Sequence, residues 1–180
     1  LVPEMIDIDE VFEDYCRRID GKAIRSRRMC YFENEDEILF FQFEKHATSR
    51  LYLTLWVGCE DKALSKLYAR SIDKPYQKLK YPAFKLMLPD FIKNITGGKE
   101  LYKTYHGNNF INGMWMYKRK NYIDLNIKQM TEISEYIIKY FKDKKIDIKS
   151  ILRKYSSYTL TEDGKETLLS NSPRFMMRLC

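Results

Sequence analysis

The sequence has few of the residues that build metal or redox centres. Its 180 residues include 2 histidines and 4 cysteines. The histidines, His46 and His106, lie far apart in the chain, and no two cysteines form a CxxC pair. Zinc sites and disulfide frameworks need these residues at short or dense spacings. We therefore expect no metal site and no cofactor, with three cysteines buried as small apolar side chains: Cys16, Cys30 and Cys59.

Long apolar runs and glycine-rich motifs are also missing. With 7 glycines, the chain contains no GxGxxG, no phosphate-binding P-loop and no GxSxG elbow. The longest strongly apolar run, Leu51 to Val57, is far shorter than the roughly 18 residues of a membrane span. The first residues show no basic region followed by an apolar stretch, as a signal peptide would. We therefore expect no membrane partner and no signal peptide in these first residues, and a leader lost ahead of Leu1 stays open. The sparse cysteines favour a cytoplasmic location.

What the chain does have is aromatic and aliphatic bulk. Hydrophobic residues make up 44% and aromatic residues 14%, carried by 14 Tyr, 10 Phe and 2 Trp. That much apolar area can fill the core of one domain. We expect a single α+β domain over residues 1–155 and a C-terminal extension or tail over residues 156–180.

Helical periodicity marks several segments. Apolar residues recur at helical spacing from Asp7 to Ile19, with Asp7 as the cap of the first amides and Gly21 as the stop. Further stripes run from Asp61 to Ile72 and from Asn126 to Lys142. Asp147 is placed to cap a shorter helix after that.

Strand patterns occupy the region after the first helix. Residues 28–32, 37–44 and 51–57 are rich in aromatic and aliphatic side chains, and the last two segments alternate. A fourth candidate runs from Met114 to Tyr117. Short links between consecutive strands favour antiparallel pairing. The sequence therefore predicts an α+β fold, an antiparallel sheet of three to five strands packed against helices on one face.

Three of these segments carry a family resemblance. They read RRMCYFEN at residues 27–34, EILFFQFEK at residues 37–45 and LYLTLWVG at residues 51–58. Together with the preceding helix, residues 12–58 resemble a bacterial domain family of unknown function, DUF4304, although His46 follows Lys45 where that family has Ser. The resemblance implies an α+β sheet with helices on one side and implies no reaction. Small domains of this kind often look like immunity proteins of bacterial toxin systems, which bind and block a partner.

One group of residues could support catalysis. Glu60 and Lys62 follow the most regular strand, and Glu37 opens the strand before it. A carboxylate and lysine at a strand end, with a second carboxylate nearby, can hold Mg²⁺ for phosphodiester cleavage. This arrangement resembles the core of restriction-endonuclease-like nucleases. Asp61, between them, is the expected cap of the next helix.

Cations and rings alternate in two later segments. The chain carries 32 Lys and Arg against 25 Asp and Glu, a net charge of +7. Interleaved cations and rings suit either a protein contact or a nucleic acid, through phosphate neutralisation and base stacking. Lysine stems that cover half-buried rings give the same pattern. The candidate binding residues are Tyr76, Lys78, Lys80, Tyr81, Trp115, Tyr117, Lys118, Arg119, Lys120 and Tyr122.

These observations leave three hypotheses open. The first is a non-enzymatic macromolecule-binding module, of the immunity type that blocks a bacterial toxin. The second is a nucleic-acid-binding protein that uses segments 74–85 and 115–128. The third is a metal-dependent nuclease. The net charge favours an acidic or neutral partner, and the pattern indicates a binding protein rather than an enzyme.

Overall fold

The computed structural model describes residues 6–46, 52–95, 98, 114–116, 120–162 and 165–170. Residues 114–116, 120–122, 155–162 and 165–170 are described as helix or strand only. The elements, in chain order, are α1 (Ile8–Ile19), β1 (Lys22–Ile24), a 3-10 turn η1 (Arg25–Arg27), β2 (Met29–Glu33), β3 (Glu37–Lys45), β4 (Tyr52–Asp61), α2 (Lys62–Ser71), β5 (Phe84–Met87), α3 (Leu88–Ile92), β6 (Met114–Met116), α5 (Lys120–Lys142), α6 (Ile148–Tyr155), β7 (Ser156–Glu162) and β8 (Lys165–Ser170).

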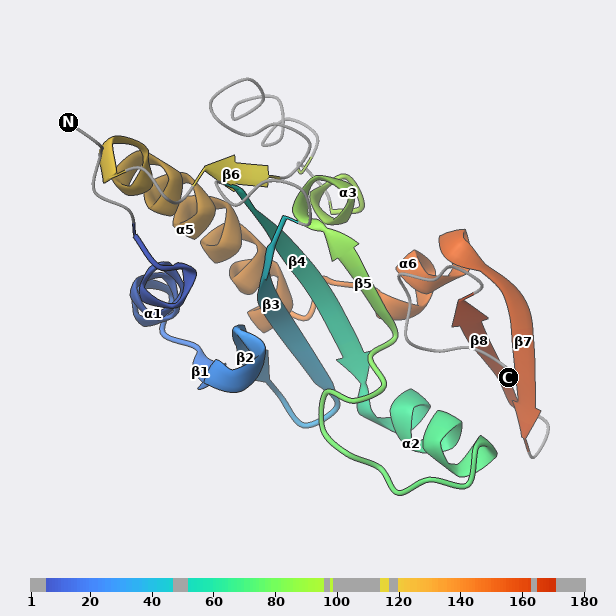
Figure 1. The fold of residues 1–180 in the computed structure, drawn as a ribbon. Helices are drawn as coiled ribbons and strands as arrows, with labels where there is room; N and C mark the ends of the chain where they lie inside the picture. The colour runs from blue at the N-terminus through green and yellow to red at the C-terminus, as the bar shows by residue number, and fades with distance from the viewer. Residues whose placement is uncertain are drawn as a thin grey trace.

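Strands β1 to β5 form an antiparallel sheet in chain order (Figure 1). β5 pairs with the second half of β4, and the short β6 pairs with its first residues. The predicted α+β fold, with an antiparallel sheet packed against helices, is therefore confirmed. β7 and β8 pair with each other in a separate two-stranded sheet, within the segment predicted as an extension.

The ends of α1 follow from local chemistry. Asp7 caps the helix as predicted, since its carboxylate accepts a hydrogen bond from the Asp9 amide at 3.1 Å. The residue that ends the helix is Asp20, which takes the left-handed conformation at φ 58° and donates its amide to the Arg17 carbonyl. The prediction that Gly21 is the stop was one residue out.

One face of the sheet carries the main core. β3 places Leu39, Phe41 and Phe43 on this face, and β4 adds the alternate residues from Leu53 to Cys59. α1, α3, α5 and α6 cover it with their apolar stripes. A buried hydrogen bond of 2.6 Å between the hydroxyls of Tyr15 and Ser134 joins α1 to α5.

The opposite face is the one toward the viewer in Figure 1, with α5 behind the sheet. The segment between α2 and β5 crosses its lower end. Leu79 from that segment is buried against Met29, Ile38 and Phe40 in a second, smaller core. This loop therefore covers part of the sheet face that lies opposite the main core.

The largest differences from the predictions are two element boundaries and two additional strands. β4 continues four residues past Val57 to Asp61, α5 begins at Lys120 rather than Asn126, and β1 and β5 are strands that no pattern predicted. For β1, β5 and the end of β4, pairing with a neighbouring strand decides the structure more than local composition does. Within the described residues, no helix is both long and apolar enough to cross a membrane.

Candidate binding face

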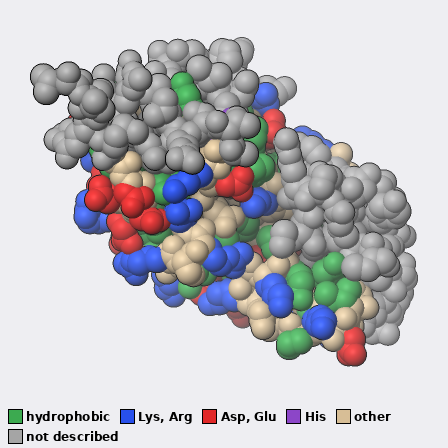
Figure 2. Space-filling model, in the orientation of Figure 1, with side chains coloured by type: hydrophobic (Ala, Val, Ile, Leu, Met, Phe, Trp, Pro, Cys, Tyr) green, Lys and Arg blue, Asp and Glu red, His purple; other side chains and the backbone are tan. Residues whose placement is uncertain are grey.

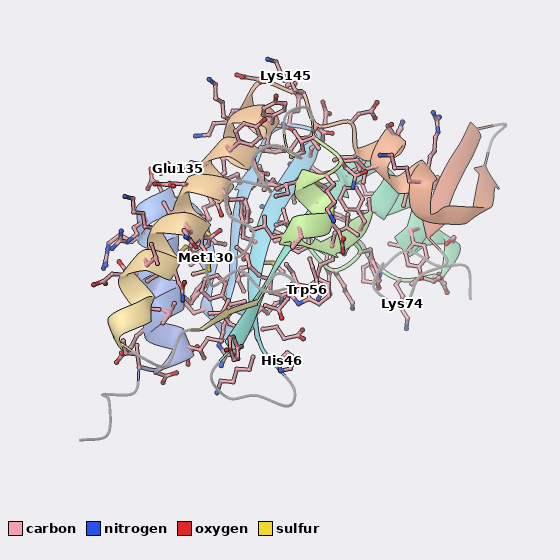
Figure 3. The ribbon with its side chains drawn as sticks, turned by 90° about the horizontal axis from the view of Figure 1, so that it is seen from above. His46, Trp56, Lys74, Met130, Glu135 and Lys145 are labelled. Carbon is pink, nitrogen blue, oxygen red and sulfur yellow. The ribbon has the colours of Figure 1, made fainter. Side chains whose placement is uncertain are left out.

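The outer face of the sheet, opposite α5, combines rings, cations and buried polar groups. Figure 3 shows Trp56 on this side and Met130 on the helix side. The outer face is made by Met29, Tyr31 and Glu33 of β2, Ile38, Phe40 and Gln42 of β3, Trp56, Gly58 and Glu60 of β4, and Lys85 of β5.

A cation and a ring stack near the middle of this face. The Lys85 ammonium lies 5.0 Å from the centroid of the Trp56 ring and 3.4 Å from the Gln42 side-chain oxygen. Burial lowers the pKa of Lys85, and the charge of Glu44 acts in the opposite direction. A partly desolvated cation over a tryptophan gains roughly 1–2 kcal/mol. The stack therefore holds both side chains in a fixed arrangement.

Glu33 gathers lysines at the lower edge of the outer face. Its carboxylate lies 2.8 Å from the Lys78 ammonium, 3.1 Å from that of Lys62 and 3.8 Å from that of Lys22. The hydrogen bond from Lys78, followed by that from Lys62, holds the pKa of Glu33 below its usual value. Lys78 also lies 5.7 Å from the centroid of the Tyr31 ring. These lysines are thus engaged within the protein.

Glu60 is fully buried beneath the loop that crosses the face. Its carboxylate accepts hydrogen bonds from the Tyr76 hydroxyl at 2.7 Å and from the Leu79 amide at 2.9 Å. Burial raises the pKa of Glu60, and the hydrogen bonds from Tyr76 and Leu79 oppose the rise. This side chain fastens the loop to β4.

The structure separates the residues of the nuclease hypothesis. Glu37 is the register partner of Asp61, whereas Glu60 is the partner of Ile38. Directly paired residues share a face of a sheet and successive residues alternate, so Glu37 and Glu60 lie on opposite faces. Glu37 lines a pocket of about 340 Å³ with Asp61 and residues 144–149 on the helix side. Burial, followed by the charge of Asp61, raises the pKa of Glu37.

Lys62 is directed to Glu33 and to the Asn34 carbonyl, which accepts its hydrogen bond at 2.8 Å. Asp61 caps α2 as predicted, because its carboxylate accepts from the Leu64 amide at 3.0 Å. Among the residues that the structure describes, no three His, Cys, Asp or Glu side chains are grouped to hold a metal ion. Because Glu37 and Glu60 lie on opposite faces of the sheet, their carboxylates are not placed to bind one metal ion together.

In the first predicted binding segment, residues 74–85, the candidate side chains contact other residues of the protein. Tyr81 is buried and packs against Tyr68 with ring centroids 5.3 Å apart and ring planes tilted by 60°, while Lys80 lies over the Tyr81 ring. Tyr76 is committed to Glu60 and Lys78 to Glu33. These contacts match the reading in which lysine stems cover half-buried rings.

The second predicted segment falls mostly outside the described side chains. Trp115 lies in β6, where its register partner is Leu53, and Lys120 begins α5. Tyr122 follows within the same helix. Tyr117, Lys118 and Arg119 lie outside the described residues.

Sequence reasoning missed the Lys85–Trp56 stack. The alternation of residues 51–57 does place Trp56 on the face opposite Leu55, so one half of the signal was present. The other half depends on β5, whose four residues are too few for a pattern to be read. The stack forms only when β5 pairs with the second half of β4.

The raised pKa of Glu60 also predicts that the stability of the protein depends on pH. Because the folded-state pKa of Glu60 is raised above the ordinary value of 4.5, the folded protein binds this proton more tightly than the unfolded chain does. The contribution to stability is then complete below about pH 4.5 and is lost as pH rises through the raised pKa. We expect the free energy of unfolding of wild type, minus that of Glu60→Gln, to fall as pH rises from 4.5 toward neutral. Urea unfolding of both proteins across this range measures it, and a constant difference would contradict the expectation.

Comparison of the chain with known protein families, with curated proteins and with solved structures found no match in any of the three. The resemblance of residues 12–58 to DUF4304 therefore stays a prediction.

Proposed function

We propose that this chain is a non-enzymatic module that binds another macromolecule through the outer face of its sheet. The observation that carries the proposal is the Lys85–Trp56 stack, a half-buried cation and ring on a face to which Gln42 adds a polar group. Tryptophan and fixed cations supply much of the affinity at protein contacts, because a rigid side chain loses little conformational entropy on binding.

The charge of the module indicates the kind of partner. Figure 2 shows Lys and Arg side chains spread over the described part of the outer face, while acidic side chains gather over α1. A cationic contact favours an acidic or neutral protein. A bacterial toxin blocked by an immunity-type module is the partner class that we propose.

Substitution on the outer face tests this proposal. We expect Trp56→Ala to weaken the complex about 30-fold or more, which corresponds to roughly 2 kcal/mol at a central contact. Partners that copurify with the wild-type chain are identified, and each is titrated calorimetrically with both proteins. The matched control is Glu135→Ala, on the exposed side of α5 (Figure 3). Equal weakening by both variants, or none by Trp56→Ala, would contradict a contact at the outer face.

A second candidate function rests on a different part of the surface. A pocket of about 470 Å³ at the end of α2 is lined by Lys66, Arg70, Lys74 and Tyr76, with Asp73 as the one acid among its described lining residues. Such a cluster suits phosphate groups, as in the nucleic-acid hypothesis. Binding of duplex DNA and RNA that weakens steeply with added salt would support this function. Affinity that does not change with salt would exclude phosphate contact as its mode.

A further inference from the structure

Two cysteines that lie 14 positions apart in the sequence meet in the core. Cys16 belongs to α1 and Cys30 to β2, and their Sγ atoms lie 2.9 Å apart. Both are buried, with exposed fractions of 5% and 0%. A disulfide holds its sulfur atoms about 2.05 Å apart, so these two need to approach by only about 0.9 Å to be joined.

The turn between α1 and β2 makes this contact. After the left-handed Asp20, the chain enters β1, where Ala23 pairs with Cys30. Gly21 lies against the thiol of Cys30: a β-carbon at this position would fall 2.2 Å from that sulfur. The absence of a side chain at Gly21 therefore leaves the space in which the two thiols meet.

We propose that Cys16 and Cys30 form a dithiol that a peroxide oxidises to an intramolecular disulfide, joining the last turn of α1 to β2. The proposal concerns the helix-covered side of the sheet and is independent of binding at the outer face. It also departs from the prediction that these cysteines serve only as apolar side chains.

With hydrogen peroxide, the reaction proceeds in two steps. The Cys16 thiolate attacks one peroxide oxygen, so that an S–O bond forms and the O–O bond breaks. Hydroxide leaves and takes up the proton that Cys16 released, giving water and a sulfenic acid. The Cys30 sulfur then attacks the sulfenic sulfur: the S–S bond forms, the S–O bond breaks, and hydroxide leaves with the Cys30 proton as a second water. Two thiols are oxidised and one peroxide is reduced.

Cys16 is the thiol expected to react first. It is the more exposed of the two, and the thiolate is the reactive form of cysteine. The hydrogen bond between the two thiols lowers the pKa of Cys16 and raises that of Cys30, while burial raises both. Cys59 offers an internal control, because it is fully buried and its pKa is raised by burial.

Peptide mapping of the full chain tests the proposal. The reduced protein is treated with hydrogen peroxide, its remaining thiols are blocked, and it is digested with trypsin without reductant. Cleavage after Arg17 and Arg28 separates the two cysteines. We expect a disulfide between the peptide ending at Arg17 and the peptide 29–45, and a fall in free thiols of the denatured protein from 4 to two. Dithiothreitol should reverse both changes.

Two variants test the order of steps. Cys30→Ser should accumulate a sulfenic acid at Cys16 that a 1,3-diketone traps, and Cys16→Ser should leave Cys30 unoxidised. Oxidised wild type should unfold at higher urea than reduced wild type, and Cys59→Ser should still form the linked peptide. A wild type in which Cys16 is oxidised without the linked peptide, or in which Cys30 links to Cys59 or Cys180, overturns the proposal.

Discussion

Replacement of Glu60 by Ala is expected to lower the free energy of unfolding by about 2–4 kcal/mol. The carboxylate is fully buried and accepts hydrogen bonds from the Tyr76 hydroxyl and the Leu79 amide. Alanine removes both acceptors at once. The buried amide then has no partner, which costs roughly 1–3 kcal/mol, and the missing side chain leaves a void beside the loop. Urea unfolding followed by circular dichroism measures the change.

Glu60→Gln is the matched control. The glutamine oxygen can accept from the Leu79 amide, and its amide nitrogen can donate to the Tyr76 oxygen, so each polar group keeps a partner. We expect a loss of less than about 1 kcal/mol near neutral pH. A loss equal to that of the alanine variant would show that the charge, rather than the pair of hydrogen bonds, holds the loop.

The same pair of variants addresses the nuclease hypothesis. If Glu60 serves only to fasten the loop, Glu60→Gln differs from the wild type only in the small loss of stability given above and in its pH dependence. If Glu60 binds Mg²⁺ for cleavage, the wild type cleaves DNA with that ion and Glu60→Gln, although folded, does not. A cleavage assay on the two proteins therefore separates a structural role from a catalytic one.

The parts of the fold that could be predicted are those with local causes. Asp7, Asp61 and Asp147 each cap the helix that follows, and a capping carboxylate needs only the amides two or three residues further along the chain. The strands β3 and β4 could be predicted for the same reason. Burial of one face of a sheet requires an apolar side chain at every second residue, and this alternation is visible in the sequence. The α+β architecture followed from such signals.

What could not be predicted depends on distant partners. Glu60 was expected just after a strand because the alternating pattern covers only residues 51–57, yet pairing with β3 and burial under Leu79 keep it inside β4. Cys16 and Cys30 meet only because the chain turns after α1 and pairs β1 with β2. The spacing of the two cysteines in the sequence does not predict this contact. The candidate site therefore depends mainly on contacts between segments that are distant in the sequence. Only individual residues of the site, such as Trp56, could be placed on their face of the sheet from the local sequence pattern.

Replacement of Gly58 by Ala is expected to lower the free energy of unfolding by about 3 kcal/mol, at the upper end of the usual effect of overpacking. Gly58 is buried in the middle of β4, where β3 and β5 pair on either side. A β-carbon there would lie 2.2 Å from Cζ of Phe40 and 2.6 Å from the backbone oxygen of Phe84. The ring can turn, but the oxygen belongs to the neighbouring strand and can move only if β5 moves with it.

Gly21→Ala is the comparison that isolates this effect. At Gly21 the nearest atoms are the sulfur of Cys30 and the ring of Phe32, which are both side chains, so the expected loss is smaller. A second comparison combines Gly58→Ala with Phe40→Leu in a double-mutant cycle. Leucine removes the ring contact and leaves the carbonyl contact of Phe84, so we expect the cycle to recover part of the loss. Full recovery would place the whole cost on the ring, and it would mean that β5 yields to the new methyl group. Equal losses at Gly58 and Gly21 would likewise contradict a rigid pairing of β4 with β5, on which the position of Lys85 over Trp56 depends.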